Sequence, residues 1–541
     1  MQKSTRYLPL LTIFSASSLI FASSVSAAPA PRAGAVPAGI RAILNKPQYR
    51  NAVWTLRVMD GNTPLVDLNS QRLLYIGSVR KIFSVGELLD AVGSAHTFNT
   101  PIYRTGSISN GVLRGNIVLV ASGDLTMGGR TNPDGTLAVS DWDHNEADSL
   151  GNAVLTKPNP LAGYAELARA VRASGITRIA GNIVIDDRLF KPFPFRGQFD
   201  VPPIFVNDDV VDIAVRPGGT PGSPANLTYR PHSAALRVYN KVRVGAPASK
   251  ESLQIDPELP SCIGSFGCAS TVSGTVPSDF KPPLTGGRQL VQTVRIVHPA
   301  NYARTMFVEQ LRAAGVRVDA PAVQQNPVRL LPARNAYARL HRVAQLVGMP
   351  YGQDAKFVLK ISYNIGADTS LMLLGVQHGA RTMQSALAFE RRDLQTRWGI
   401  APTQYHFVDG SGGGETTATA AAVTTMLQEL ARSRESQAFT NALPVLAVDG
   451  SLGFVTGFKR QRSLAGAAGN VRAKTGTYVG KSASGRLEIK TQALGGYVTT
   501  KRGHRLTFEV AVNGVPMNDL EDLTNIFQDE GTIAAILWRD Y

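Results

Sequence analysis

The sequence predicts an α+β fold in which one domain is interrupted by a long, mainly β insertion. Residues 52–59 alternate in the manner of a half-buried strand, and a helical apolar stripe follows Gly77. Between residues 101 and 335, short β-like runs are separated by turns rich in glycine and proline. Helical periodicity then returns and ends in further strands. We therefore expect residues 28–100 and 336–541 to form one domain around an inserted region, 101–335, of two subdomains.

The individual elements follow from local periodicity. Ile82, Val85 and Leu89 recur at steps of three and four residues, which predicts a helix after Gly77. Residues 505–513 alternate strictly between apolar and other side chains, which predicts a strand. The remaining expected elements are strands at 65–68, 471–475 and 493–498, helices near 163–173, 300–314, 338–347, 356–376 and 417–433, and a final helix that carries Leu523 and Leu537.

The composition is that of a globular protein. The chain has 541 residues, of which 43% are hydrophobic and 18% charged, a balance that disfavours an intrinsically disordered chain. After the first thirty residues no apolar run approaches the roughly 18 residues that span a bilayer. Two cysteines are too few for a disulfide scaffold or a four-cysteine zinc site.

The N-terminus has the pattern of an export signal. Lys3 and Arg6 precede a mostly apolar stretch, residues 8–22, and the small residues 25–27 suit cleavage before Ala28. We expect residues 1–27 to be a signal peptide and the protein to be exported, periplasmic or associated with the cell envelope. The alternative is an uncleaved N-terminal anchor.

Export affects the interpretation of the cysteines and of the charge. Cys262 and Cys268 lie in a glycine- and serine-rich stretch, where we expect a local disulfide; two free thiols are the alternative. The formal net charge is +16, which suits peripheral contact with an anionic membrane or cell-wall polymer. Nucleic acid is disfavoured because basic and aromatic residues are not interleaved.

Three short motifs occur in a fixed order. Ser78 and Lys81 form an S-x-x-K at the start of the first helix, followed by Ser362-Tyr363-Asn364 and then by Lys474-Thr475-Gly476. An isolated S-x-x-K is weak, since about two are expected by chance in a chain of this length. The second one, from Ser278 to Lys281, is flanked by prolines and is predicted to be a loop. The alternative for Ser78 is a helix-capping serine beside a solvated lysine.

The spacing of these residues suits nucleophilic catalysis by serine. Residues three apart on a helix share a face, so Lys81 can take the proton of Ser78. For that its pKa must fall from about 10.4, through burial and a second cation such as Lys474. Ser362 and Asn364 can point into one cleft. The backbone N–H groups of Ser78 and Thr477 would form an oxyanion hole.

At this point the chain resembles the low-molecular-mass class C penicillin-binding proteins, the D-alanyl-D-alanine carboxypeptidase/endopeptidase family. The three motifs match the S-x-x-K, S-D-N and K-T-G set, the second at its two outer positions only. The resemblance extends over nearly the whole mature chain. Other segments that carry it are 119–124, 408–412 with its D-G-S-G, 443–452, 495–497 and 508–513. It implies a β-lactamase/transpeptidase-like domain, an antiparallel sheet flanked by helices.

The resemblance also implies a mechanism. Ser78 would attack the bond between the two terminal D-alanines of a peptidoglycan stem peptide, and Lys81 would accept its proton. Ser362 and Lys474 would relay a proton to the leaving amine, and Asn364 would hold substrate. Lys474, Thr475, Gly476 and Thr477 would bind the carboxylate end and the oxyanion. Water would hydrolyse the acyl-enzyme, D-alanyl–diaminopimelate crosslinks would also be cut, and β-lactam antibiotics would acylate Ser78. Neither a metal nor a cofactor is required.

The chain departs from the family pattern in three places. Tyr363 stands where aspartate or asparagine is commoner, and residues 481–490 would lengthen a hairpin beside the third motif. After D-G-S-G the family often continues Leu-Ser-Arg, whereas residues 413–415 are Gly-Gly-Glu, so a substrate-binding arginine is missing there. Two alternatives therefore stay open: a serine β-lactamase or esterase of the same fold, and a non-catalytic cell-wall-binding protein.

Weaker patterns concern possible metal or peptide binding. Residues 141–152 resemble a calcium loop but lack its glycine and its final glutamate, so we interpret them as a solvated acidic loop. Asp186 and Asp187 could bind peptide, as acidic residues in this region do in the family, or simply form a turn. The histidines lack metal-ligand spacing, and the glycine run 411–414 is not a nucleotide fingerprint.

Overall fold

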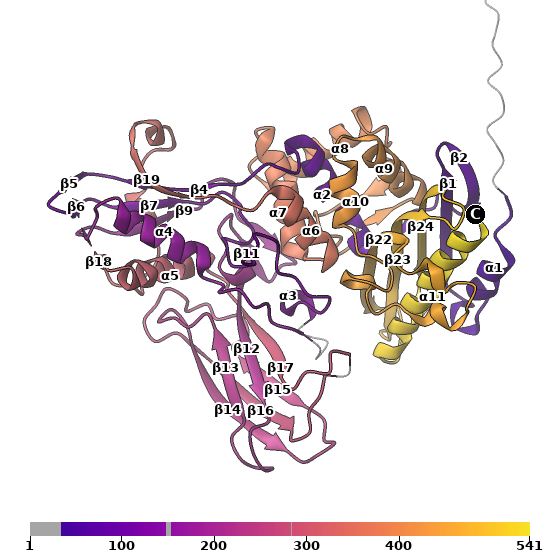
Figure 1. Cartoon of the computed structure of the whole chain (residues 1–541), viewed down its shortest axis with the longest axis horizontal. Helices are drawn as coiled ribbons and strands as arrows, with labels where there is room; N and C mark the ends of the chain where they lie inside the picture. Colours follow the sequence, from indigo (N-terminus) through magenta and orange to yellow (C-terminus); the bar gives the residue numbers. More distant parts are fainter. Residues whose placement is uncertain (1–33, 148–152, 283) are drawn as a thin grey trace, which may run out of the picture. The chain divides into compact units, whose positions relative to one another are not determined.

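Five antiparallel strands form the main part of the largest sheet. They come from the N-terminal and the C-terminal parts of the chain. Figure 1 shows the indigo strands β1 and β2 beside β24, and Leu56 of β1 pairs with Val510 of β24. The spatial order is β2 (Thr63–Leu68), β1 (Val53–Asp60), β24 (Arg505–Asn513), β23 (Leu487–Thr499) and β22 (Val471–Lys481), with β25 (Val515–Pro516) paired to β23. The predicted strands at both ends of the chain are therefore confirmed.

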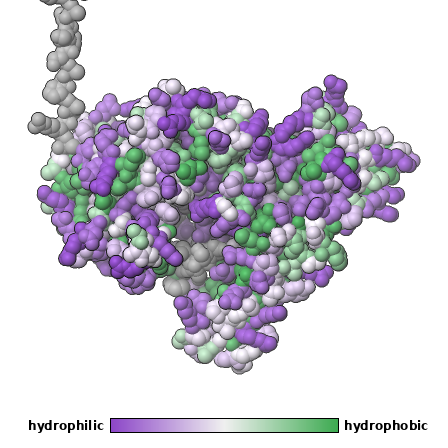
Figure 2. Space-filling model, turned by 180° about the vertical axis from the view of Figure 1, so that it is seen from behind, coloured by the Kyte–Doolittle hydropathy of each residue, from purple (hydrophilic) through white to green (hydrophobic). Residues whose placement is uncertain are grey.

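This computed structural model describes residues 34–147, 153–282 and 284–541, which belong to the compact unit Ala33–Tyr541. The predicted signal peptide, 1–27, lies outside the described residues. None of the helices within the described ranges combines the length and the apolar character needed to cross a bilayer. On the face drawn in Figure 2, apolar side chains gather in several separate patches among hydrophilic ones.

The sheet has a helical layer on each face because successive side chains of a strand point to opposite sides. Leu494 of β23 belongs to the core beneath helix α11, whereas its neighbour Ala493 belongs to the core around α2. Every residue from Lys81 to Asp90 in α2 is buried, so this helix lies inside the protein instead of on its surface. The helices of these layers are α1 (Ala38–Leu44), α2 (Lys81–Val92), α6 (Tyr351–Lys360), α7 (Asn364–Gln377), α8 (Met383–Thr396), α9 (Ala420–Arg432), α10 (Ser436–Ala442) and α11 (Leu520–Asp540).

Two sequence-based helix predictions are wrong. The helix expected at 338–347 is instead β19 (His341–Leu346), an antiparallel partner of β4 (Thr100–Arg104). A neighbouring strand with free backbone groups overrides the local periodicity here. The single helix expected at 356–376 is two helices, α6 and α7, because Ser362 between them adopts a φ of +68°.

Within the described ranges, residues 101–335, the expected inserted region, hold three α-helices, most of two four-stranded sheets and a β-rich part. Strands β4, β7 (Ile117–Val120) and β9 (Ile183–Asp186) form one sheet with β19, against which α5 (Pro299–Ala313) packs. The other described elements are β5 (Ser107–Ser109), β6 (Val112–Arg114), α3 (His144–Ala147), α4 (Ala162–Ala173), β8 (Arg178–Ile179), β10 (Phe193–Phe195), β11 (Phe199–Val201), β12 (Val210–Arg216), β13 (Asn226–Arg230), β14 (Arg237–Gly245), β15 (Ser252–Asp256), β16 (Ala269–Pro277), β17 (Leu290–Arg295) and β18 (Arg317–Val318).

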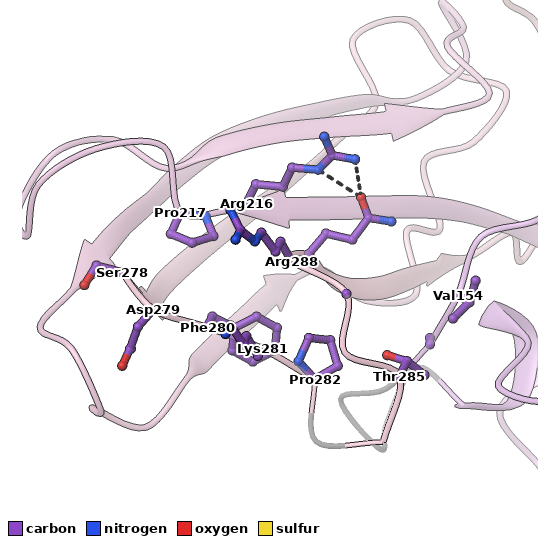
Figure 3. Close-up of a pocket in the computed structure, with 13 residues that line it drawn as sticks. Val154, Arg216, Pro217, Ser278, Asp279, Phe280, Lys281, Pro282, Thr285 and Arg288 are labelled. Atoms are coloured by element: carbon purple, nitrogen blue, oxygen red, sulfur yellow. Dashed lines mark hydrogen bonds between the residues drawn. The ribbon is translucent and has the colours of Figure 1, made fainter.

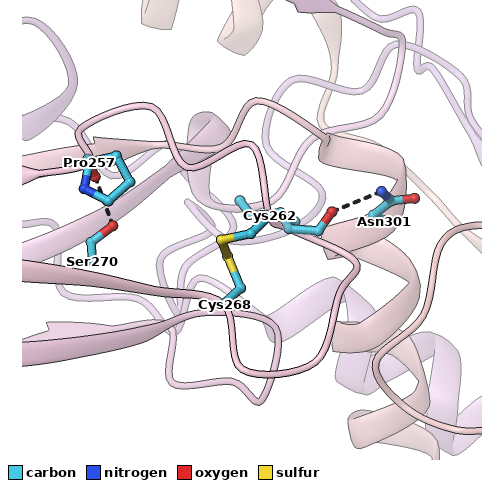
Figure 4. The surroundings of a disulfide bond; sticks show 6 residues. Pro257, Cys262, Cys268, Ser270 and Asn301 are labelled. Atoms are coloured by element: carbon cyan, nitrogen blue, oxygen red, sulfur yellow. Dashed lines mark hydrogen bonds between the residues drawn. A yellow bond between two sulfur atoms is a disulfide. The ribbon is translucent and has the colours of Figure 1, made fainter.

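The predicted disulfide is confirmed. Cys262 and Cys268 are joined by an S–S bond that closes a short loop (Figure 4). Asn301 of α5 donates a hydrogen bond to the backbone carbonyl of Ile263 in this loop, at 2.9 Å. The bond therefore fixes a loop that is attached to a neighbouring helix of the inserted region.

Candidate active site

Ser78 lies on a short 3-10 turn, Gly77–Arg80, that continues directly into α2. The Nζ of Lys81, one turn on, is 2.6 Å from the Oγ of Ser78. Gly77 has a φ of +48°, and a Cβ there would lie 2.8 Å from the backbone N of Thr477. Only glycine therefore allows the turn to approach β22 so closely.

The second motif meets the first between α6 and α7. The Oγ of Ser362 is 3.3 Å from the Nζ of Lys81 and 3.0 Å from the Nζ of Lys474, so two lysines flank one hydroxyl. Asn364 begins α7, and its Oδ1 accepts a hydrogen bond of 2.7 Å from Lys81. The structure thus brings five of the sequence-predicted residues, Ser78, Lys81, Ser362, Asn364 and Lys474, into one hydrogen-bonded group.

The third motif lies on β22, at the edge of the main sheet. The hydroxyl of Thr475 is 2.7 Å from that of Ser451. A Cβ on Gly476 would lie 2.1 Å from the carbonyl oxygen of Ile76, so this position also needs glycine. The hydroxyl of Thr477 donates to Gln492, and the backbone N of Thr477 faces the Ser78 turn.

Burial sets the protonation of the two lysines. Both side chains are inaccessible to solvent, and desolvation disfavours a charged amine. Burial lowers the pKa of Lys81 to about 7, with a smaller contribution in the same direction from the cation of Arg196. Burial and the charge of Lys81 hold the pKa of Lys474 well below its usual range. An amine that is half neutral near pH 7 can accept a proton from a serine hydroxyl.

The D-G-S-G loop helps to hold Lys81. The carboxylate of Asp409 accepts hydrogen bonds from the backbone N–H groups of residues 411–413. Asp368 accepts a further one from Gly410. The carbonyl oxygen of Ser411 then accepts from the Nζ of Lys81 at 3.0 Å. The sequence pointed to this loop because the loop resembles a family segment. The contact of the loop with Lys81 was not predicted.

Glu146, from α3 of the inserted region, is a residue that sequence reasoning missed. Its carboxylate accepts hydrogen bonds from the backbone N and the side-chain Nδ2 of Asn364, at 2.9 and 2.8 Å. This orients the amide so that its Oδ1 faces Lys81. Burial raises the pKa of Glu146. The two partners are 218 positions apart in the chain, and no local pattern connects them.

The expectation of a solvated acidic loop at 141–152 is wrong for residues 143–145; Asp141 is exposed, and residues 148–152 lie outside the described residues. Asp143, His144 and Asn145 are buried, because Arg130 neutralises Asp143 through two hydrogen bonds of 2.7 and 2.8 Å. Within the described ranges, no group of three or more histidine, cysteine, aspartate or glutamate side chains could hold a metal ion.

The structure gives the positions of two of the departures from the family pattern. Tyr363 is fully buried beside Phe357, with its hydroxyl directed to the backbone of Asp208, so it does not occupy the cleft. Residues 481–490 extend the β22–β23 hairpin, as expected, and Lys481 pairs with Leu487.

A cavity of about 640 Å³ opens beside Ser78. Its lining residues come from all three motif regions and from the inserted region: Ser78, Pro194, Arg196, Gly197, Asn364, Val408, Asp409, Gly412, Gly413, Gly414, Thr477, Tyr478 and Val479.

A second cavity, of about 850 Å³, lies in the β-rich part of the inserted region (Figure 3). Ser278 and Lys281 line it in the loop that follows β16, which confirms the loop prediction for the second S-x-x-K. None of the residues of the three motifs lines this cavity.

Comparisons with known proteins agree on one family. A model of the D-Ala-D-Ala carboxypeptidase 3 (S13) family matches residues 36–531. A D-alanyl-D-alanine carboxypeptidase of Actinomadura sp. is 26% identical over 504 residues, covering 88% of this chain and 80% of that protein. The D-alanyl-D-alanine carboxypeptidase DacB of Haemophilus influenzae is 22% identical over 492 residues, covering 88% of each.

The fold agrees with solved structures. Penicillin binding protein 4 (dacB) from Haemophilus influenzae superposes with a TM-score of 0.67 at 18% identity, covering 92% of this chain and 99% of the other. The same protein in complex with a novel β-lactam gives 0.64 at 19% identity, covering 93% and 99%. The expected β-lactamase/transpeptidase-like fold is therefore confirmed.

Proposed function

Because the chain belongs to the D-Ala-D-Ala carboxypeptidase 3 (S13) family of serine peptidases, we propose that it removes terminal D-alanine from peptidoglycan stem peptides through an acyl-enzyme on Ser78. The observation that carries this proposal is the 2.6 Å contact between Ser78 and a fully buried Lys81 whose pKa is about 7. That contact supplies a base for the serine hydroxyl at neutral pH.

Acylation uses the groups around Ser78 in turn. The Oγ of Ser78 bonds to the carbonyl carbon between the two D-alanines while its proton passes to the Nζ of Lys81. The backbone N–H groups of Ser78 and Thr477 stabilise the resulting oxyanion. When the peptide C–N bond breaks, a proton reaches the leaving amine through Ser362, which touches both Lys81 and Lys474.

Substrate binding and deacylation complete the cycle. Lys474, Thr475 and Gly476 bind the terminal carboxylate, and the Thr475–Ser451 hydroxyl pair offers donors to it. Asn364 holds the acyl portion. Water then attacks the ester, a proton returns to Ser78, and the shortened peptide leaves.

The same site supports two further proposals. Crosslinks that join D-alanine to diaminopimelate present the same bond to Ser78, so the enzyme also acts as an endopeptidase. β-Lactam antibiotics acylate Ser78; a related penicillin binding protein 4 has been solved with a β-lactam.

The protein works in the periplasm or the cell envelope, in keeping with its N-terminal signal pattern and its disulfide.

The proposal is tested by mass spectrometry of the mature protein after incubation with penicillin, together with D-alanine release from a stem pentapeptide. We expect a persistent adduct on Ser78, and Ser78→Ala should lose both the adduct and D-alanine release. Ser278→Ala, in the other S-x-x-K, is the matched control and should retain both.

Two outcomes would favour the alternatives. Rapid hydrolysis of penicillin without D-alanine release would indicate a β-lactamase. A folded wild-type protein that binds cell wall but forms no adduct and releases no D-alanine would indicate a non-catalytic binding protein.

A further inference from the structure

One exposed sheet face in the β-rich part of the inserted region carries a row of positive charge. Strands β14, β16 and β15 form a three-stranded sheet in that spatial order (Figure 1). Successive side chains of a strand point to opposite sides, so every second residue of β14 lies on the same side. On one side these residues are Arg237, Tyr239, Lys241 and Arg243, and all four are exposed. We call these four residues the β14 row.

The opposite side of the same sheet is buried. Val242 and Val244 of β14, together with Val272 and Val276 of β16, belong to the hydrophobic core. A slip of one residue along the strand would turn these valines to solvent, so the core determines which side of the sheet faces outward. The β14 row is therefore held on the surface by the packing of a regular sheet.

Uncharged polar side chains continue this face across the other two strands. The partners of the β14 row on β16 are Ala269, Thr271, Ser273 and Thr275. The hydroxyl of Thr275 lies 3.1 Å from that of Ser252 on β15, which joins the second strand to the third. Across these three strands, all of which the structure describes, the acidic residue is Asp256 at the end of β15. Because Asp256 pairs with Thr271, strand β16 separates it from the β14 row.

The cations of the β14 row are not neutralised by the protein. Within the ranges that the structure describes, Arg237 and Lys241 form neither an ion pair nor a side-chain hydrogen bond, and Arg243 donates to the backbone carbonyl of Gly222 at 3.4 Å. Three such cations in a row suit a polymer that carries repeated negative charges. Tyr239 stands among them, 51% exposed, and offers a flat, amphipathic ring at a low cost in conformational entropy.

The composition of this face favours a carbohydrate polymer over a lipid surface. Hydroxyl side chains both donate and accept hydrogen bonds and so match the hydroxyls of a sugar, whereas a face that docks on a membrane buries large apolar side chains. Phe266 is an apolar ring at the Arg237 end, 93% exposed. It lies in the disulfide loop, where the carbonyl of Cys268 accepts a hydrogen bond from the backbone N of Arg237. A lipid surface is therefore the occupant that the experiment must distinguish.

We propose that this face binds peptidoglycan itself, with its cations on carboxylates of the stem peptides and the ring of Tyr239 against a sugar of the glycan strand. The two arginines can each hold a carboxylate through two parallel hydrogen bonds, and Lys241 adds a point charge. No residue of the β14 row lines the cavity beside Ser78, so the face is a second contact with the polymer. The identity of the polymer rests on the proposed function, but the binding needs no catalysis.

Co-sedimentation with purified, insoluble peptidoglycan tests this inference. Ser78→Ala is the parent protein, so that the polymer is not cut during the measurement. Replacing Arg237, Lys241 and Arg243 together by glutamine should weaken binding about tenfold, because three exposed charge pairs are lost. Added salt should weaken binding of the parent more than that of this β14 triple variant. Tyr239→Ala should also weaken binding, and Tyr239→Phe, which keeps the ring, should retain it.

The matched control replaces Arg41, Arg50 and Arg72 together by glutamine. These three arginines are also exposed and lie in the N-terminal part of the described chain, so the control makes the same change in net charge away from β14. It should bind peptidoglycan as the parent does. Equal binding by the two triple variants would overturn the inference, and so would unchanged binding by Tyr239→Ala.

Two further measurements separate this inference from the proposed function. With Ser78 restored, the β14 triple variant should form the penicillin adduct and release D-alanine from a soluble pentapeptide at wild-type rates. If the wild type does neither, the proposed function fails, and co-sedimentation still decides the role of the face. Vesicles of phosphatidylglycerol provide the lipid comparison. Binding of the parent to these vesicles that the β14 triple variant loses, without binding to peptidoglycan, would assign the face to a membrane and overturn the inference.

Discussion

At the scale of single residues, Lys81 is the most constrained side chain of the site. Its ammonium group contacts Ser78, Ser362, Asn364 and the carbonyl of Ser411, yet it has no access to solvent. Hydrogen bonds to acceptors favour the charged form, while burial disfavours it more strongly. The balance leaves an amine that changes protonation near neutral pH.

This balance predicts the pH dependence of acylation. Because the proposed base must be neutral, and burial lowers the pKa of Lys81 to about 7, kcat/KM should rise with pH and level off above that value. Below it, activity should fall by about tenfold per pH unit, as expected for one proton. The measurement is the penicillin acylation rate between pH 5 and 9, with D-alanine release as a second readout. A rate that stays constant from pH 5 to 7 would exclude Lys81 as the base.

At the scale of elements, the site depends on close contact between the Ser78 turn and strand β22. Glycines line this contact on both sides, Gly77 on the turn and Gly476 on the strand. Each permits a backbone approach that a methyl group would block. The backbone N–H groups of Ser78 and Thr477, the proposed oxyanion donors, can converge only if this spacing is kept.

Gly476→Ala should therefore impair acylation without unfolding the protein. The new Cβ would lie 2.1 Å from the carbonyl oxygen of Ile76, and backbone atoms must separate to relieve it. A displacement of about 1 Å can cost roughly a hundredfold in rate, which is the loss we expect in the penicillin acylation rate. Gly480→Ala on the same strand is the control, since its nearest neighbour is the flexible side chain of Lys490 at 3.3 Å. Equal acylation rates in the two variants would contradict this account.

At the scale of the whole molecule, a buried ionic cluster links the inserted region to the helices that carry the second motif. Arg130 pairs with Asp143 and Asp208, and its guanidinium lies 4.1 Å from the ring of Phe357 in α6. Asp143 directly precedes α3, which holds Glu146 against Asn364. The inserted region thereby influences the geometry around Lys81.

Removing the cation from this cluster should destabilise the protein. Arg130→Met would remove the guanidinium from two buried carboxylates and leave His144, 3.8 and 3.9 Å away, as the cation nearest to them. We expect the free energy of unfolding to fall by about 3–5 kcal/mol. Denaturant unfolding measures this, and the acylation rate should fall as well because Glu146 loses its support. Arg178→Met, which breaks an exposed pair with Asp319, is the control and should change neither quantity measurably. Equal free energies of unfolding in the two variants would show that the ionic cluster does not stabilise the protein.

Local patterns correctly predicted most of the main sheet, the helices near 163–173, 300–314 and 417–433, and the final helix. Strand alternation and helical stripes are properties of neighbouring residues, so they are visible in the sequence. The errors occurred where distant contacts prevailed. Pairing with β4 turned residues 341–346 into a strand, and Arg130 drew the acidic residues near 143 into the interior.

The sequence by itself determined the order of the three motifs and placed Ser78 and Lys81 on one helical turn, because a separation of three residues is a local matter. The tertiary structure decided the pKa of Lys81, the contact of Glu146 with Asn364 and the position of Arg196 beside Ser78. These depend on burial and on through-space contacts between segments more than a hundred residues apart, which no local pattern encodes.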